Sequence, residues 1–255
     1  MLSKNKISEI SSLHQKKFRQ SLGYFIAEGE KIVDELLYST WEVVALFATE
    51  ELYQKYQTIA PQIQLAEAHL FAKISALKTP SGILAVVKQK YLSIDKVEVQ
   101  NKFTLCLDGV RDPGNLGTII RIADWFGIST IVCSDDTVDV YNPKTIQATM
   151  GSFLRVNVIY TQLIPFLIHA KAQQVQLFGA VLNGENVYDK KDVKQGIIIM
   201  GSESHGISDE VLHLIDEPIT IPEKLIKNKQ VNGAIDSLNV AIATSVICAV
   251  FAQKN

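Results

Sequence analysis

Three separated polar segments contain the residues most suited to catalysis. They are residues 108–121 (DGVRDPGNLGTIIR), 201–206 (GSESHG) and 237–240 (SLNV). The first two follow apolar runs of the kind that form buried strands, and the third begins an apolar helix. Because open α/β sheets bind ligands at the carboxyl ends of their strands, we expect the three segments to form one site.

The most informative side chain in these segments is that of Arg121. It follows Asn115 by about one and a half helical turns, in an otherwise apolar helix. A guanidinium in such a helix needs an anionic partner, which is either an internal carboxylate or a phosphate group. The position of Asn115 after an Asp-Pro-Gly turn predicts that it caps this helix.

The polar side chains of the other two segments each have a simpler structural interpretation. A carboxylate such as Glu203 is favourable near a helix N-terminus, but Ser208 is already placed to cap the helix that follows. This leaves Glu203 open to another role. Taken alone, Ser237 is best explained as the cap of the last helix. The patterns of a dinucleotide-binding turn, a P-loop and a nucleophile elbow are absent.

The composition indicates a folded protein. Of the 255 residues 47% are hydrophobic, which is ample for a packed core, and the net charge of −2 provides no overall attraction to nucleic acid. The first twenty residues hold five basic residues and one acidic residue. This local basic helix either contacts phosphates or is a solvated surface.

The cysteines and histidines lack the spacing of a metal site. The three cysteines are scattered, which favours reduced thiols over a disulfide framework, and the five histidines show no ligand pattern. The sequence has neither a signal peptide nor an apolar run long enough to span a membrane. We therefore expect a cytoplasmic protein that needs no metal and no membrane.

The pattern of apolar runs predicts two α/β domains. Strand-like runs at 24–27, 42–47 and 82–87, with a helical pattern at 28–38, predict a small three-layer α/β domain over residues 1–95. The polar residues 96–102 are the expected linker. From residue 103 onward, continuous apolar runs predict a mainly parallel sheet covered on both faces. The last helix, 238–251, is apolar nearly all round, which suits a subunit interface.

The motifs together resemble one enzyme family. The order DxVxDPxNxGxxxRxAxxFG (108–127), GSExxG (201–206), IP (221–222) and SLNV (237–240) resembles the SpoU family of the SPOUT superfamily, whose members are RNA ribose 2′-O-methyltransferases. The resemblance covers residues 103–255. The N-terminal region is similar to the small ribosomal-protein-like RNA substrate-binding domain that is often fused to these enzymes.

The resemblance implies a fold, a cofactor and an assembly. The residues alone would predict an ordinary doubly wound sheet, whereas the family has a C-terminal trefoil knot, an exception to the rule against threaded chains. S-adenosylmethionine would be held near Leu182, Met200, Gly201, Ile221 and Leu238. The active enzyme would be a homodimer with its active sites at the subunit interface.

The resemblance also implies the catalytic set. It consists of Arg121, Asn115, Glu203, Ser237 and Asn239. The arginine is usually described as activating the ribose hydroxyl, yet a guanidinium is a poor base because its pKa lies above about 12. We therefore expect Arg121 to hold the neighbouring phosphate bidentately and so to fix the ribose, while phosphate or water receives the proton.

Several alternatives stay open. The expected substrate is structured RNA, with ribosomal RNA favoured over transfer RNA. The chain could instead be a non-catalytic RNA-binding or ribosome-assembly factor that retains the fold, or a SPOUT relative that methylates a base. A basic insertion at 223–232 departs from the family pattern, and it is either an RNA contact or a tolerated surface insertion. Ala241 stands where the family often has a second serine.

Overall fold

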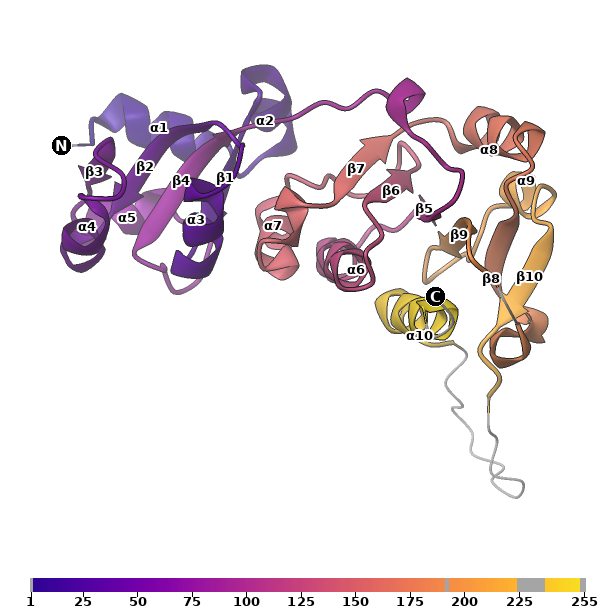
Figure 1. Cartoon of the computed structure of the whole chain (residues 1–255). Helices are drawn as coiled ribbons and strands as arrows, with labels where there is room; N and C mark the ends of the chain where they lie inside the picture. The colour runs from indigo at the N-terminus through magenta and orange to yellow at the C-terminus, as the bar shows by residue number, and fades with distance from the viewer. Residues whose placement is uncertain (1, 191–192, 224–236, 253–255) are drawn as a thin grey trace. The chain divides into compact units, whose positions relative to one another are not determined.

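The structure is a computed structural model that describes residues 2–190, 193–223 and 237–252. These residues form two compact units (Figure 1). The first unit combines residues 1–91 with 139–154, and the second combines 92–138 with 155–255. The domain boundary expected at 96–102 stays a prediction, and no sequence pattern indicated that residues 139–154 would join the first unit.

The first unit is built on a four-stranded sheet with the order β1-β4-β2-β3. Strands β1 and β2 run antiparallel to β4, and β3 runs parallel to β2. The strands are β1 (Tyr24–Glu28), β2 (Val43–Ala48), β3 (Ile63–Leu65) and β4 (Ile83–Lys88). The helices are α1 (Lys4–Ser12), α2 (Lys16–Leu22), α3 (Glu30–Leu37), α4 (Glu50–Tyr56) and α5 (Ala68–Ile74).

Alternation along the strands places helices on both faces of this sheet. Phe25 belongs to a core shared with α3 and α4, whereas the next residue, Ile26, belongs to a core shared with α1 and α5. Successive side chains of a strand point to opposite faces, so the two cores lie on opposite sides of the sheet. The unit therefore has the three layers expected from the sequence.

Residues 139–154 complete the first of these two cores. They form α7 (Pro143–Thr149) and a short 3-10 turn, η2 (Ser152–Leu154). The Phe153 ring packs edge-on against Phe25 and Trp41, at centroid distances of 5.7 and 5.5 Å, and Ile146 is buried in the same cluster. The next strand begins only at Asn157, because the chain is still packed into this core at Leu154.

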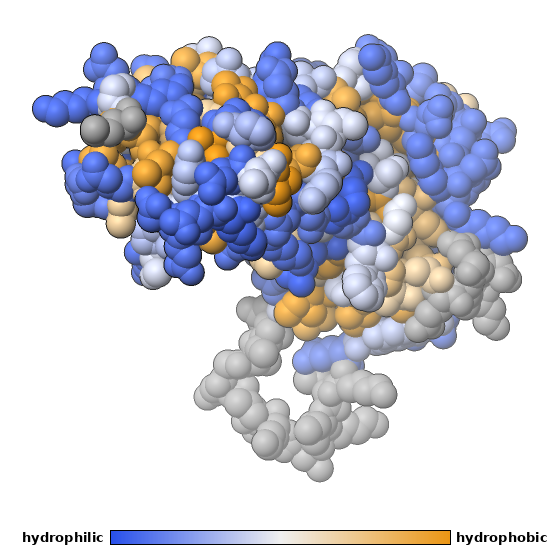
Figure 2. Space-filling model, turned by 60° about the vertical axis from the view of Figure 1, so that its left-hand side comes forward, coloured by the Kyte–Doolittle hydropathy of each residue, from blue (hydrophilic) through white to orange (hydrophobic). Residues whose placement is uncertain are grey.

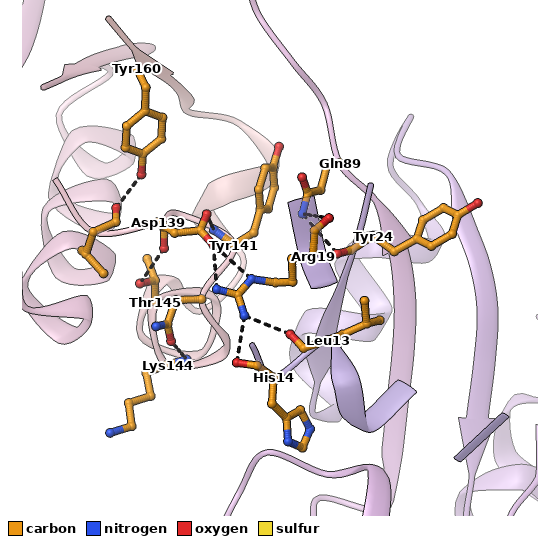
Figure 3. A network of polar contacts seen from close by, with 12 residues as sticks. Leu13, His14, Arg19, Tyr24, Gln89, Asp139, Tyr141, Lys144, Thr145 and Tyr160 are labelled. Carbon is orange, nitrogen blue, oxygen red and sulfur yellow. Dashed lines mark hydrogen bonds and ion pairs between the residues drawn. The ribbon is translucent and has the colours of Figure 1, made fainter. Parts of the chain in front are cut away.

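The basic N-terminal segment differs from its expected form in one respect. Lys16 and Lys17 are exposed on α2, but Arg19 is only 1% exposed. Its guanidinium lies in the polar network of Figure 3, where it pairs with Asp139 and donates to backbone carbonyls. Arg19 is therefore a structural residue and does not belong to a phosphate-contacting surface.

The second unit is built on a six-stranded sheet with the order β10-β8-β9-β5-β6-β7, in which each neighbouring pair is parallel. This confirms the predicted parallel sheet. The strands are β5 (Phe103–Asp108), β6 (Thr130–Cys133), β7 (Asn157–Tyr160), β8 (Leu177–Asn186), β9 (Gly196–Gly201) and β10 (Glu217–Thr220). Two short 3-10 turns lie outside the sheet, η1 (Ile94–Lys96) and η3 (Val187–Asp189).

Helices cover both faces of this sheet as well. On one face α8 (Leu163–Ala172) and α9 (Asp209–Leu212) bury side chains against Cys106 and its neighbours. On the other face lie α6 (Pro113–Trp125) and α10 (Val240–Ala252), which pack against each other. Phe251 of α10 stacks on Phe103 of β5 at 5.5 Å. Among the described helices none combines the length and the apolar character that a membrane span requires.

Candidate functional site

Three polar side chains from the three motifs meet in the second unit. The Asn115 Nδ2 group donates a hydrogen bond to Glu203 Oε1, and the Asn239 Nδ2 group donates to Asn115 Oδ1 at 3.0 Å. Asn115 lies in the first turn of α6, Glu203 follows β9, and Asn239 precedes α10. The structure thus brings together three of the five predicted catalytic residues. In the sequence, Glu203 lies 88 positions and Asn239 lies 124 positions after Asn115.

The start of α6 leaves the Asn115 side chain free for this contact. Asp112 is the helix cap, because its Oδ1 accepts from the Asn115 amide at 2.8 Å, and Pro113 follows as the first helical residue. The prediction that Asn115 caps the helix is therefore wrong. Proline suits the first helical position since the amide it lacks would have no helical partner there.

Asp108, in the first motif, is hydrogen-bonded to Ser208, which lies just after the second motif. It ends β5, in register with Gly201 of β9, and its Oδ2 accepts from both the amide and the hydroxyl of Ser208, at 2.8 and 2.7 Å. Ser208 does precede α9 as expected, but its hydroxyl is used for Asp108 and not for a capping bond. Sequence reasoning missed this role of Asp108, although an acidic residue at the end of a buried strand could have indicated it.

The glycines of the second motif allow a very tight turn. A Cβ atom on Gly201 would lie 2.1 Å from the carbonyl carbon of Gly206, so no side chain fits at this position. Ser202 and Gly206 exchange two backbone hydrogen bonds, at 3.0 and 2.9 Å. This turn sets the position of Glu203, which lies inside it.

The start of α10 also differs from the sequence-based interpretation. Asn239 caps the helix, because its Oδ1 accepts from the amides of Ala241 and Ile242 at 3.0 and 3.3 Å. Ser237 is exposed, and its hydroxyl bonds to no residue that the structure describes. The structure therefore does not bring Ser237 into the cluster, and the expectation that it caps the helix is wrong.

Arg121 lies on the exposed face of α6. Within the described part of the chain its guanidinium forms no hydrogen bond and no ion pair. Of the two anionic partners considered from the sequence, an internal carboxylate is therefore not found among these residues. An unpaired, solvent-facing guanidinium is suited to a phosphate that arrives with a ligand.

The residues expected to hold S-adenosylmethionine lie on three adjacent strands and at the start of α10. Met200 and Gly201 end β9, Leu182 lies in β8, and Ile221 follows β10. The Thr220 hydroxyl donates to the Leu182 carbonyl at 3.0 Å, which ties the end of β10 to the middle of β8. Leu182 and Leu238 are 69% and 50% exposed. Exposed leucines beside the end of β9 and the start of α10 would suit a ligand with an apolar ring and polar edges only if they face one cavity, so their exposure alone is consistent with the expected cofactor site.

The structure says less about two other expectations, which concern the basic insertion and the absence of a metal site. The basic insertion 223–232 lies outside the described residues except for Glu223, which is exposed. No group of three or more histidine, cysteine or acidic side chains in the described ranges could hold a metal ion. The three cysteines are free and buried, and burial raises the pKa of each thiol, which makes them unreactive.

Comparison with known proteins identifies the family. Residues 102–249 match the SpoU rRNA Methylase family. This chain belongs to that family. Residues 4–85 match the MRM3-like substrate binding domain, which agrees with the similarity expected for the N-terminal region.

Three known proteins are similar to this one along nearly the whole chain. The 23S rRNA (guanosine(2553)-2′-O)-methyltransferase RlmP of Bacillus subtilis is 30% identical over 95% of this chain and 94% of its own length. The AdoMet-bound rRNA methyltransferase from Sinorhizobium meliloti superimposes with a TM-score of 0.86 at 27% identity, covering 99% and 97% of the two chains. A TrmH-family structure from Porphyromonas gingivalis has a TM-score of 0.84 at 34% identity, with 98% of each chain covered.

Proposed function

We propose that the protein transfers a methyl group from S-adenosylmethionine to a ribose 2′-hydroxyl of ribosomal RNA. The observation that carries this proposal is the Asn115–Glu203–Asn239 cluster, in which residues of three SpoU motifs meet, together with Arg121 on α6, which pairs with no residue that the structure describes. Relatives named as 23S rRNA 2′-O-methyltransferases and an AdoMet-bound relative support the reaction and the cofactor.

The side chains suggest a mechanism based on positioning. S-adenosylmethionine, when bound, supplies an electrophilic methyl group that needs an oxygen nucleophile in line with it. Arg121 holds the phosphate next to the target ribose through two parallel hydrogen bonds. The hydrogen-bonded side chains of Asn115, Glu203 and Asn239 form one side of the site and orient the ribose. Holding two reactants in the correct geometry removes much of the barrier to a bimolecular step.

Ribosomal RNA is the favoured substrate, with transfer RNA as the second candidate. The first unit matches a substrate-binding domain, and its α2 carries the exposed Lys16 and Lys17, which could contact phosphates. Relatives from Bacillus subtilis and Escherichia coli are named for methylation of 23S rRNA. The basic insertion at 223–232 is a further RNA contact that we propose from its charge alone.

We further propose that the active form is a homodimer that pairs through α10. Ile242 of this helix is 56% exposed, and Val246 and Ala249, on the same helical face, are only partly covered. Figure 2 shows apolar surface open to solvent on the visible side of the molecule. An apolar helix face left uncovered in one chain suits a second copy of that chain. The trefoil knot and the cytoplasmic location stay predictions from the sequence.

The deciding experiment compares cells with and without the protein. Mapping 2′-O-methyl groups across cellular RNA should show one or a few ribosomal positions that lose their methyl group when the gene is deleted. Restoration by the purified protein with S-adenosylmethionine would confirm a direct reaction. If no ribose methyl group changes and calorimetry detects no binding of S-adenosylmethionine, the chain is the non-catalytic RNA-binding factor. Loss of a base methyl group would instead indicate the base-methylating relative.

A further inference from the structure

The first unit contains a cavity that none of the catalytic motifs explains. Its volume is about 290 Å³. One wall is formed by the end of β1 and the segment after α5, and the other by α7. Its lining consists of Ile26, Glu28, Ala76, Leu77, Pro143, Lys144, Gln147, Ala148 and Met150. Because ligand pockets range upward from about 300 Å³, this one suits a single small ring system.

The cavity is apolar except for three side chains. Glu28, the last residue of β1, is only 4% exposed. Gln147 is half-buried and Lys144 is exposed, and neither side chain has a hydrogen-bond partner among the residues that the structure describes. Lys144 points away from the polar network of Asp139 in Figure 3. A ligand would thus meet an acidic group inside, an amide on the wall and a cation outside.

The Glu28 carboxylate is buried with neutral partners only. Its two oxygens accept from the Ser75 hydroxyl and the Ala76 amide, each at 2.6 Å. No lysine, arginine or histidine in the described part of the chain lies within ion-pair distance of it. Burial raises the pKa of Glu28, although the bonds from Ser75 and Ala76 and the charge of His14 oppose that rise. A buried carboxylate that forms no ion pair with a described residue is costly, which favours a functional reason for its presence.

The chemistry of this carboxylate selects among ligands. An ionised carboxylate only accepts hydrogen bonds and offers about four acceptor positions, of which Ser75 and Ala76 use two. The remaining positions fit a ligand that presents two adjacent N–H donors. Guanine does so through its N1 and 2-amino groups. Adenine, cytosine and uracil each place an acceptor beside their donor, which a carboxylate repels.

We propose that this cavity binds an unpaired guanine of the RNA substrate, with Glu28 accepting from its N1–H and 2-amino groups and Lys144 contacting its phosphate. Proteins commonly read single-stranded RNA by taking unstacked bases into such pockets. This inference rests on the proposed RNA-modifying function and adds a sequence-reading contact outside the catalytic motifs. It would help to select the RNA, while the second unit performs the methyl transfer.

The test uses nucleotides that differ by single groups. Guanosine, inosine and adenosine 5′-monophosphates are added at millimolar concentration to the full chain, and binding is followed by saturation-transfer NMR. Guanosine monophosphate should bind about tenfold or more tightly than inosine monophosphate, which lacks only the 2-amino group, and adenosine monophosphate should bind least. Equal binding of the three nucleotides would overturn the proposal.

Two variants connect this binding to the cavity. Ala148→Leu fills the cavity without changing the carboxylate, and Glu28→Gln replaces one acceptor by a donor; both should abolish the preference for guanine. Ala72→Leu adds the same volume at an exposed position of α5, outside the cavity, and should change nothing. If Ala148→Leu or Glu28→Gln retains the guanine preference while the protein stays folded, the cavity is not the site.

Two more measurements are needed. The first distinguishes a guanine of RNA from a free nucleotide, and the second distinguishes failure of the cavity proposal from failure of the proposed methyl transfer. Substrate RNA should displace guanosine monophosphate, and Ala148→Leu should raise KM for the RNA with kcat nearly unchanged. If RNA does not displace the nucleotide, the site serves a free nucleotide and the proposal fails. Binding of S-adenosylmethionine and methyl transfer are assayed separately. Methylation without any guanine preference refutes the cavity alone, whereas guanine preference without methylation refutes the proposed reaction alone.

Discussion

Arg19 and Asp139 form a buried ion pair across 120 positions of the chain. The Nε and Nη2 atoms of Arg19 donate to the same oxygen, Asp139 Oδ2, at 3.0 and 2.7 Å. The remaining nitrogen, Nη1, donates to the carbonyls of Leu13 and His14, both at 2.9 Å (Figure 3). This pair joins the N-terminal helices to the start of the segment 139–154, which the sequence places between two strands of the other unit.

Replacing Arg19 by methionine should strongly destabilise the first unit. The change leaves the Asp139 carboxylate without its cation and two carbonyls without their donor, and breaking a buried pair costs about 3–5 kcal/mol. Arg111→Met provides the control, because its pair with Asp136 is mostly exposed and such pairs contribute about 0–1 kcal/mol. Urea unfolding of both variants measures the difference. Equal midpoints would show that the Arg19 pair is not important for stability.

Protonation of Glu28 should make the stability of the first unit depend on pH. Burial raises the folded-state pKa of Glu28 above its ordinary value of 4.5. A raised pKa means that the uncharged form favours folding, so this contribution is complete below pH 4.5 and is lost as pH rises through the folded pKa. The unfolding free energy of the wild type should therefore fall relative to that of Glu28→Gln over this interval. A difference that does not vary with pH would contradict the burial argument.

Conversion of Arg121 to lysine should reduce methyl transfer while the fold is kept. A lysine retains the charge but loses the parallel pair of donors that a phosphate accepts. Since a hydrogen bond to a charged group contributes about 1.5–3 kcal/mol, we expect a loss of roughly 10- to 150-fold in kcat/KM. Arg111→Lys in the same motif should retain activity. Full activity of Arg121→Lys would show that the bidentate contact is not needed.

The sequence predicted those parts of the site that depend on local pattern. Buried parallel strands are recognisable as apolar runs, and the motifs after β5 and β9 follow directly from them. The family resemblance placed Asn115, Glu203 and Asn239 in one catalytic set, but the hydrogen bonds that join them were not predicted. The capping roles were assigned to the wrong neighbours, since Asp, Ser and Asn are all good caps and only the backbone geometry decides between them.

The features that sequence analysis missed are contacts between distant residues. Nothing near Arg19 or Asp139 indicates that they pair, because each is an ordinary charged residue in a polar stretch. The burial of Ile146 and Phe153 likewise depends on packing against residues far away in the sequence, such as Phe25.

Strand β3 was missed for a different reason. It has only three residues, too few to show alternation.

Coupling between Asn115 and Glu203 can be measured by a double-mutant cycle. Asn115→Ala and Glu203→Ala should each lower kcat/KM, and the double variant should be little worse than either single variant, because both remove the same hydrogen bond. Rates with saturating S-adenosylmethionine and varied RNA provide the comparison. Fully additive losses would mean that the two side chains act independently and that their bond has no catalytic importance.

A charge on the exposed face of α10 should separate the proposed dimer. Ile242 is 56% exposed and begins the uncovered apolar face of this helix, so Ile242→Lys would place an ammonium group where a second copy is expected to pack. Light scattering after gel filtration should then report a single chain of 28.3 kDa in place of twice that mass. Ile59→Lys is the matched control, because Ile59 is 53% exposed but lies in the first unit. If Ile242→Lys keeps the mass of a dimer, α10 is not the surface through which two chains associate.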